Sequence, residues 1–574
     1  MAEVSYVEIV GSARNKWLAL PEHWRSRSFR ARDRIMELLF VERFNFNRVY
    51  IKSGYAQWQI EGDLRGHLAR MLGENPDLSF HTKPESFNDA LAEVLRDQRA
   101  FAALDFGKDV AEHDHNLARY FVSTKAYQQA LSGYKSIIIG PKGSGKSAIM
   151  LELSKERIAG YSIKITPEVF ATSMLQRFTS ESEGVWDEEQ AFVSTWIFTM
   201  LVEVFRTVCR GQRGKDKALS RIRQFLQQHS EYNDVDLFTR FITRLSRIQA
   251  VKLGTYEIAV KTKELQRLYA LEDVYALIPD VRKALNEDVL VLLDELDTGW
   301  DNTEHANRFV ASLMQAAIRV QGLGLRIRVV AFLRSEIFDL VKHSLDHLDK
   351  LRSSIERLHW DIHALSLLVL KRVAFSCQVP AQSLDPASIK LLFPQSCREM
   401  SGFEYLITRT TRRPREVLQF VRLTHEGALN QKLGSMTRSA LLQAEEQFSQ
   451  WKLEHVCSEY KFIYPDIERL LVEFRGRGPV LSREEMIDIV QECVSHWTSD
   501  PPKWLTADVE DLIQRLYDIE FIGIQRLNSR PGIHGILRGF EFAYEHPAGQ
   551  LGRVAAFLIH PAFWSALEIV DSTT

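Results

Sequence analysis

The chain has 574 residues, of which 45% are hydrophobic and 26% are charged, as in ordinary soluble globular proteins. Its length predicts about three or four domains. Its formal net charge of −2 excludes a general attraction to nucleic acid or to a membrane surface, so binding of that kind would need a local patch.

Cysteine usage and hydropathy predict a cytoplasmic protein with no membrane partner. The five cysteines lie far apart and none is paired at C-x-x-C spacing, which argues against a zinc site and suits a reducing compartment. No apolar run is expected to reach the roughly 18 residues of a membrane span. The first ten residues lack a signal-peptide pattern.

Residues 1–104 are predicted to form a small α/β or α+β domain whose role the sequence leaves open. An effector, an adaptor and an oligomerisation unit are all compatible with it. Its arginine cluster, from Arg25 to Arg34, suits phosphate, RNA or DNA. The same cluster also suits a solvated helix face that pairs with Asp33 and Glu37.

A lead-in from Phe106 to Lys135 is predicted as a turn followed by helices. Two of its aromatic residues, Phe121 and Tyr127, are candidates either for contact with a nucleotide base or for core packing.

The next stretch has the pattern of a phosphate-binding loop. Residues 136–139 form a short, β-branched apolar run typical of a buried strand, and the sequence GPKGSGKS that follows matches the Walker A pattern. Its glycines let main-chain N–H groups curl around phosphate oxygens. Lys146 would reach the β- and γ-phosphates, and the Ser147 hydroxyl would ligate Mg²⁺. The predicted nucleotide-binding residues of this loop are Gly140, Pro141, Lys142, Gly143, Ser144, Gly145, Lys146, Ser147 and Ala148.

A second strand is predicted at residues 161–167, followed by a mostly helical insertion at 168–285. Within it, residues 191–208 are apolar enough to be buried. Residues 210–223 are basic and suit either a nucleic-acid face or an exposed helix with scattered charge.

Residues 288–295 have the pattern of a Walker B strand, since a short apolar run ends in two acids. Asp294 is predicted to hold Mg²⁺, and Glu295 to orient and deprotonate the attacking water. Asp297 and Asp301 suit either metal contact or simple solvation.

Three arginines beyond the Walker B run are candidates for sensing or stabilising the γ-phosphate. Arg334 ends the next apolar strand and would either sense the phosphate or pair with Asp339 or Glu336. Arg352 or Arg357 would act in trans as an arginine finger, or form surface ion pairs.

A helical lid is predicted at residues 361–455. Pro414 begins one of its helices, and Arg415 in the first turn would grip the γ-phosphate.

Residues 456–574 are predicted as three helices followed by strands, a winged-helix pattern. The arginines near the predicted wing suit DNA phosphates, whereas the acidic middle helix favours docking to a protein. The arginines are Arg526, Arg530 and Arg538, and the acids are Glu484, Glu485 and Asp488.

The order of these motifs resembles that of AAA-related P-loop ATPases. Arg334 is similar to the strand-end sensor of their STAND branch, and Arg415 to the lid arginine called sensor 2. The loop GPKGSGKSA and the lead-in FGKDVAEHD resemble bacterial P-loop ATPases of which some are linked to phage defence. The resemblance covers about residues 105–574, with Arg rather than the classical Asn at the strand tip. It implies an ASCE-type parallel sheet, a catalytic role for Glu295, and nucleotide-dependent assembly.

Together these observations predict an α/β P-loop core at 105–360, a helical lid at 361–455 and a winged-helix-like domain at 456–574. The expected function is a switch ATPase that requires Mg²⁺ and ATP, assembles as a homo-oligomer and controls a partner effector protein, in bacterial antiphage defence. The alternative is an ATPase that remodels or loads onto DNA through the winged helix. A third possibility, a nucleotide sensor without hydrolysis, is disfavoured by the intact Glu295.

Overall fold

The computed structural model describes most of the chain beyond residue 86. The described ranges are 87–155, 160–165, 188–211, 216–229, 237–253, 271–285, 287–295, 300, 302–342, 351–379, 384–497, 501–526, 539–547, 551–552 and 554–570. The chain divides into two compact units, Met1–Ala90 and Leu91–Thr574. Residues 1–86 of the predicted N-terminal domain, its arginine cluster among them, lie outside the described residues, as do Asp297, Asp301, Arg530 and Arg538.

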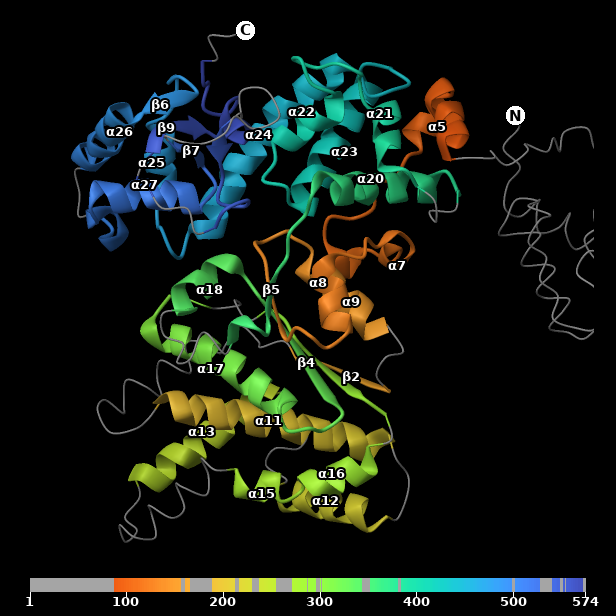
Figure 1. Ribbon diagram of the computed structural model, residues 1–574, viewed down its shortest axis with the longest axis vertical. Helices are drawn as coiled ribbons and strands as arrows, with labels where there is room; N and C mark the ends of the chain where they lie inside the picture. The colour runs from red at the N-terminus through yellow and green to blue at the C-terminus, as the bar shows by residue number, and fades with distance from the viewer. Residues whose placement is uncertain are drawn as a thin grey trace, which may run out of the picture. The chain divides into compact units, whose positions relative to one another are not determined.

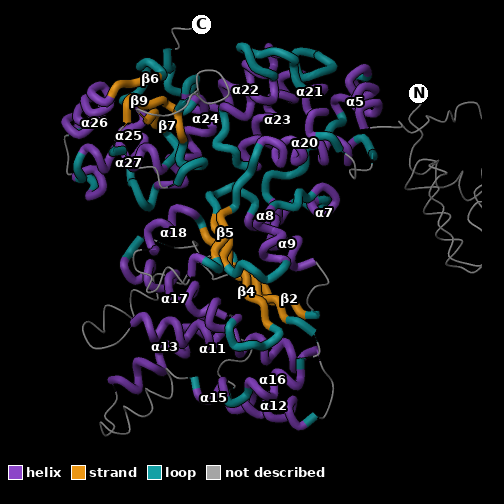
Figure 2. Tube along the Cα trace, in the orientation of Figure 1, coloured by secondary structure: helices purple, strands orange, loops and turns teal. Residues whose placement is uncertain are grey.

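The core of the second unit is a five-stranded parallel sheet with the strand order β2-β3-β4-β1-β5. Figure 2 draws its strands in orange, with β2, β4 and β5 labelled. Its strands are β1 (Ile137–Ile139), β2 (Tyr161–Ile165), β3 (Val289–Leu293), β4 (Ile327–Leu333) and β5 (Ile355–Arg357). Every residue of β1 and β3 is buried, as the continuous apolar runs predict. Because β4 lies between β1 and β3, the strands that carry the two predicted motifs are separated by one strand.

Helices connect these strands, as parallel crossovers require (Figure 1). They are α9 (Lys146–Lys155), α11 (Glu188–Gly211), α12 (Lys217–Gln228), α13 (Leu237–Leu253), α15 (Glu272–Tyr275), α16 (Ile278–Ala284), α17 (Glu304–Gln321) and α18 (Ser335–Val341). The described part of the predicted insertion at 168–285 is therefore mainly helical.

Helix α11 is the apolar centre of this layer. It packs against α17 and α13, where Trp196 contacts the rings of Phe241 and Phe309. By length and composition Glu189–Gly211 would suffice to cross a membrane, contrary to the expectation that no run approaches that length. However, 83% of its most apolar window is buried inside the protein, as expected for a core helix.

Further helices come before β1 and after β5 in the sequence. Before β1 come α5 (Phe87–Arg96), α6 (Gln98–Ala102), η2 (Ala111–His113), α7 (Leu117–Tyr120) and α8 (Lys125–Leu131). After β5 come α20 (Ile362–Ser376), η6 (Pro386–Ser388), α21 (Ile389–Leu392), α22 (Gly402–Thr408), α23 (Pro414–Asn430) and α24 (Arg438–Tyr460). Side-chain caps from Asp361, Ser401 and Thr437 begin α20, α22 and α24, and Pro414 begins α23.

The lead-in is joined to the first lid helix by a buried polar cluster. The Asp114 carboxylate accepts hydrogen bonds from the Tyr120 hydroxyl and from the Lys108 main chain. The Arg372 guanidinium of α20 lies 4.5 Å from the centre of the Tyr120 ring. Gly107 has φ +73°, and a Cβ there would meet the Tyr120 hydroxyl at 2.6 Å. The lead-in motif thus has a structural role.

Within the described residues, the C-terminal module has three α-helices, two short 3-10 helices and a four-stranded antiparallel sheet of order β6-β9-β7-β8. Its elements are α25 (Ile467–Val472), β6 (Val480–Ser482), α26 (Arg483–His496), η7 (Lys503–Thr506), α27 (Val509–Asp518), β7 (Ile522–Arg526), β8 (Phe540–Glu541), β9 (Val554–Ile559) and η9 (Pro561–Phe563). The sequence pattern missed β6, a three-residue strand whose pairing partner β9 is more than 70 residues away, so no local pattern marks it.

Candidate nucleotide-binding site

The predicted phosphate-binding loop connects β1 to α9, which begins at Lys146. Gly143 and Gly145 have φ +80° and +96°, a region that favours glycine, so the backbone curl depends on these two residues. A Cβ at Gly140 would meet the Ser144 hydroxyl oxygen at 2.5 Å. The loop therefore has little room for side chains, and the N-terminus of α9 points toward it, as an anion site requires.

The Lys146 ammonium folds back over this loop. Its Nζ donates to the carbonyl oxygens of Gly140 at 2.7 Å and Pro141 at 2.9 Å. The lysine is thus held at the loop, where a triphosphate would take over these contacts.

The serine of the first motif meets the aspartate of the second. The Ser147 hydroxyl, in the first turn of α9, donates to Oδ2 of Asp294, which directly follows β3, at 3.1 Å. Burial raises the pKa of the Asp294 carboxyl, and it outweighs the lowering effects of the Glu295 main-chain N–H, Lys146 and Ser147. A cation would therefore compensate a buried carboxylate that its neighbours compensate only in part.

These two oxygen ligands fit Mg²⁺, which prefers hard oxygen donors and usually keeps water and substrate phosphates in its shell. Within the described ranges, no group of three or more His, Cys, Asp and Glu side chains could hold a metal by itself. Ser147 and Asp294 therefore suit a metal that arrives with a nucleotide.

The predicted catalytic acid, Glu295, follows Asp294 directly and is exposed. Its φ of +58° is uncommon for a residue with a side chain, and it turns the chain at the carboxyl end of β3. Such strained residues gather at functional sites.

Arg334 and Glu336 lie at the end of β4, whose register places Leu333 beside Ile139 of β1. Arg334 Nη1 is 3.8 Å from Glu336 Oε1, and the Ser335 N–H donates to the Gly140 carbonyl at 3.3 Å. The predicted pairing of Arg334 with Glu336 is thus present, and the pair adjoins the loop.

The carboxyl of Glu336 is itself unusual. Its side chain is 7% exposed, and neither oxygen has a hydrogen-bond partner among the residues that the structure describes. Burial and the nearby Glu459 carboxylate raise its pKa to about 7, against the effects of Lys146 and Arg334. The sequence pattern indicated Glu336 only as an ion-pair partner for Arg334 and did not predict its burial.

Arg415, the predicted lid arginine, is in the first turn of α23 and contacts the loop. Its main-chain N–H donates to the Gly143 carbonyl at 3.3 Å, and a Cβ at Gly143 would meet Arg415 Cβ at 3.0 Å. The Arg415 Nε is buried without a hydrogen-bond partner among the described residues. This N–H group of the guanidinium can therefore donate a hydrogen bond to an acceptor such as a phosphate oxygen.

The two finger candidates differ in their surroundings. Arg357 pairs with Asp339 at 3.1 Å and lies over the Phe338 ring, so its charge is used within the chain. Arg352 is exposed.

The aromatic candidates for base contact have packing partners. Phe121 and Tyr127 meet edge to face with centroids 4.9 Å apart, and Tyr127 is buried. Core packing accounts for Tyr127.

Sequence reasoning missed Trp360, which supports the loop from the strand-to-lid connection. Its indole N–H donates to the Ser144 carbonyl at 2.8 Å, and the side chain is largely buried. A tryptophan just before a predicted helix was the available signal.

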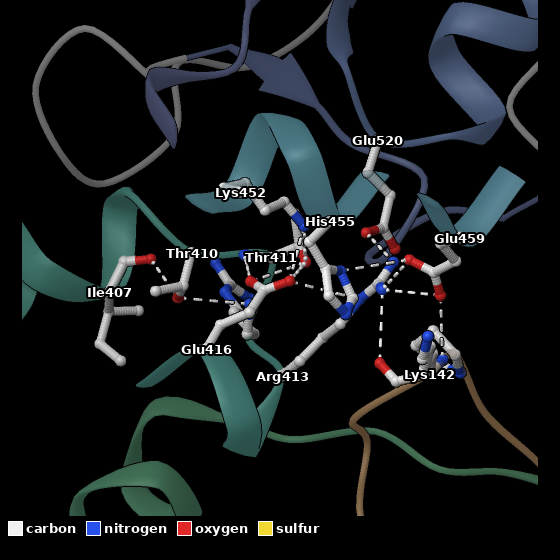
Figure 3. A network of polar contacts seen from close by, with 12 residues as sticks. Lys142, Ile407, Thr410, Thr411, Arg413, Glu416, Lys452, His455, Glu459 and Glu520 are labelled. Carbon is white, nitrogen blue, oxygen red and sulfur yellow. Dashed lines mark hydrogen bonds and ion pairs between the residues drawn. The ribbon is translucent and has the colours of Figure 1, made fainter. Parts of the chain in front are cut away.

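Sequence reasoning also missed a buried charge network around Arg413 (Figure 3). Arg413 Nη1 donates to Glu459 Oε2 at 2.8 Å, and its Nη2 to Glu520 Oε2 at 2.5 Å. Lys452 Nζ donates to Glu416 Oε1 at 2.6 Å. Burial opposes the charge of Glu416, but Lys452 and Arg413 outweigh it and lower its pKa to about 2. The network is therefore charged and joins α23, α24 and the C-terminal module.

Comparison with known proteins gives partial matches. A family described as the FunZ-associated C-terminal helical domain matches residues 363–457. A putative transposon gamma-delta 80.3 kDa protein of Escherichia coli K12 is 22% identical over 484 residues, 81% of this chain and 67% of that protein. Allergen Alt a 2 of Alternaria alternata is 25% identical over 152 residues, 26% of this chain and 80% of that protein.

Two solved archaeal structures align at low TM-scores. The Aeropyrum pernix ORC2 protein in ADPNP–ADP complexes has TM-score 0.35 and 11% identity, covering 79% of this chain and 95% of that one. Cdc6p from Pyrobaculum aerophilum has TM-score 0.26 and 9% identity, covering 72% and 91%. The description of the fold therefore rests on the strand order of the sheet and on the geometry of the loop after β1.

Proposed function

We propose that this protein is a Mg²⁺-dependent ATPase that acts as a molecular switch. The observation that carries the proposal is the hydrogen bond from Ser147 to Asp294, because it unites a glycine-rich loop and a strand-end carboxylate that lie about 150 residues apart in the sequence. A glycine-rich turn with no function would have no reason to meet that carboxylate.

The loop amides, Lys146 and the N-terminus of α9 would hold the phosphates of ATP. Ser147 and Asp294 would hold Mg²⁺, which supplies charge neutralisation at the β- and γ-phosphates. Glu295 would orient a water molecule and accept its proton as the water oxygen attacks the γ-phosphorus and the bond to the bridging oxygen breaks. The products are ADP and inorganic phosphate.

Arginines would supply the remaining positive charge. Arg415 is positioned over Gly143, and Arg334 stands at the strand edge beside the loop. Arg352 is the candidate for a finger that acts on a neighbouring subunit, which would make hydrolysis depend on assembly.

Steady-state phosphate release tests this proposal. Lys146→Ala should abolish nucleotide binding and turnover, and Asp294→Ala should remove the Mg²⁺ dependence. Glu295→Gln should bind ATP and lose turnover by about 100-fold or more, since general base catalysis contributes on that order. Lys155→Ala is the matched control, because Lys155 lies on the same helix, is exposed, and pairs with Glu152 of that helix. Unchanged binding and turnover in Lys146→Ala would refute the proposal.

The proposed output of the switch is control of an effector, with the N-terminal segment or a separate protein as the effector and antiphage defence as the setting. ATP would promote assembly into a homo-oligomer. Light scattering with and without ATP tests this, and a monomer under both conditions would contradict it.

A second candidate function is action on DNA. The E. coli relative is named as a transposon protein, which favours a test for it. In the C-terminal module, however, Arg477, Arg483 and Arg526 each pair with a glutamate, which suits a protein partner better. Salt-dependent binding of duplex DNA together with stimulated ATP hydrolysis would favour the DNA function.

A further inference from the structure

A carboxylate at the end of α24 lies on the phosphate-binding loop. Glu459, in the last turn of α24, accepts a hydrogen bond from the Lys142 main-chain N–H at 3.2 Å. Its side chain is fully buried. Burial opposes its charge, but Arg413 above all, with His455 and Lys452, outweighs burial and lowers the pKa to about 2. The loop that would bind phosphate therefore already holds a negative charge.

The same carboxylate is one end of a chain of contacts to the C-terminal module (Figure 3). Arg413 Nη1 bonds both Glu459 oxygens, at 2.8 and 3.1 Å, and approaches the Lys142 carbonyl at 3.4 Å. Arg413 Nη2 then bonds Glu520, which lies between α27 and β7. One buried guanidinium thus connects the loop to the module.

The charges of the residues in this series of contacts do not balance. Two cations, Arg413 and Lys452, face three carboxylates, and Lys452 is committed to Glu416. Arg413 therefore serves Glu459 and Glu520 together. The buried carboxyl of Glu336 adds to the negative charge near Glu459. In so buried a place, a triphosphate would repel these carboxylates strongly and attract the guanidinium.

We propose that Glu459, Arg413 and Glu520 form a nucleotide-sensitive latch between the phosphate-binding loop and the C-terminal module. A triphosphate displaces Glu459 from the Lys142 N–H, and Arg413 follows the negative charge away from Glu520. The C-terminal module loses its ionic link to the loop and is free to dock elsewhere. The inference rests on the proposed binding of ATP at the same loop.

The latch requires reciprocal coupling. If nucleotide binding weakens the contact at Glu520, then weakening that contact must strengthen nucleotide binding by the same factor. A network that only stabilises the fold predicts something else: loss of Glu520 would lower stability and leave nucleotide affinity unchanged, because Glu520 bonds Arg413 rather than a group of the loop.

The test uses the full chain with Glu520→Gln, which removes one charge at nearly constant shape. Titration with a non-hydrolysable ATP analogue and Mg²⁺ should show affinity raised about fivefold or more, the lower range of typical couplings. Hydrogen exchange at the β7 amides should be faster in the variant without nucleotide. Saturating analogue should accelerate the same amides in the wild type.

Glu445→Gln is the matched control. Glu445 lies on the same helix as Glu459 and pairs with an arginine, Arg409, at 3.0 Å, and it accepts a hydrogen bond from the Tyr405 hydroxyl, so both partners belong to the predicted lid. It should leave the affinity for the analogue unchanged. Glu459→Gln is a second test variant, which removes the charge at the loop itself and should also raise affinity, so a folding defect in one variant leaves the other to decide.

Three outcomes separate the claims. Wild-type affinity in both Glu520→Gln and Glu459→Gln overturns the latch, as does β7 exchange in the wild type that nucleotide does not alter. If the wild type binds the analogue, Lys146→Ala abolishes binding and the latch variants change nothing, the latch alone fails. If the wild type binds no analogue, the proposed function fails.

Discussion

At the scale of single residues, two constraints fix the backbone of the loop, one within the Walker A motif and one from a residue outside it. The two left-handed glycines and the tight packing at Gly140 account for the glycines of the pattern. The nearness of Arg415 to Gly143 is a second constraint, because it brings a lid residue to van der Waals distance of the loop.

Gly143→Ala tests this second constraint. The methyl group is strained at φ +80° and meets Arg415 Cβ at 3.0 Å, so the free energy of unfolding should fall by about 1–3 kcal/mol and affinity for ATP should fall as well. The control is Gly476→Ala, since Gly476 has φ +70° but nothing within 4 Å of an added Cβ. Equal losses of ATP affinity in the two variants would contradict a role for the Arg415 contact.

At the scale of elements, the connection from β5 to α20 holds the loop through one indole. Trp360 donates to the Ser144 carbonyl, while Asp361 caps α20 through the Ala364 N–H. The connection therefore links the loop's shape to the position of the first lid helix.

Trp360→Phe should leave the Ser144 carbonyl without this donor and lower stability by about 1–3 kcal/mol. Because the loop would also loosen, ATP affinity should fall. Trp504→Phe is the control: its indole N–H donates to the Pro465 carbonyl at the same 2.8 Å, in the C-terminal module. Denaturant titrations should show similar losses for both variants, and nucleotide titrations a loss for Trp360→Phe alone. Equal affinities would contradict the proposed support.

At the scale of the whole molecule, stability should depend on pH through buried histidines. Burial lowers the pKa of His455 to about 4 and of His560 to about 3, and it also lowers that of His425. In the unfolded chain these groups titrate near pH 6.5. Between those values each of these histidines binds a proton in the unfolded chain but not in the folded protein, so its contribution to stability is fully present above about pH 6.5 and is lost as the solution is acidified.

His455→Phe should reduce the slope of the unfolding free energy against pH by about 1.4 kcal/mol per pH unit between roughly pH 4.5 and 6. The reason is that the unfolded variant binds one proton fewer than the unfolded wild type, so the difference in bound protons between the unfolded and folded states is smaller by one. The phenyl ring should keep the stacking on Trp451, whose centroid is 5.0 Å from that of His455. Chemical denaturation across this range measures the slope. A variant with the wild-type slope would show that His455 is protonated in the folded protein.

The amino-acid sequence alone determined the local features. It predicted the buried strands that flank the loop, the acids that end the Walker B run and the helix that begins at Pro414, because short-range apolar patterns, glycines and caps leave a local signal. Tertiary structure decided what those segments meet. Trp360, Glu459 and Glu520 reach their partners from positions more than 100 residues away, and no spacing rule encodes such contacts. The pairing of Ser147 with Asp294 was expected from the motifs. The burial of Arg413 arises only when three segments that are distant in the sequence fold together, so no local pattern predicted the buried charge network.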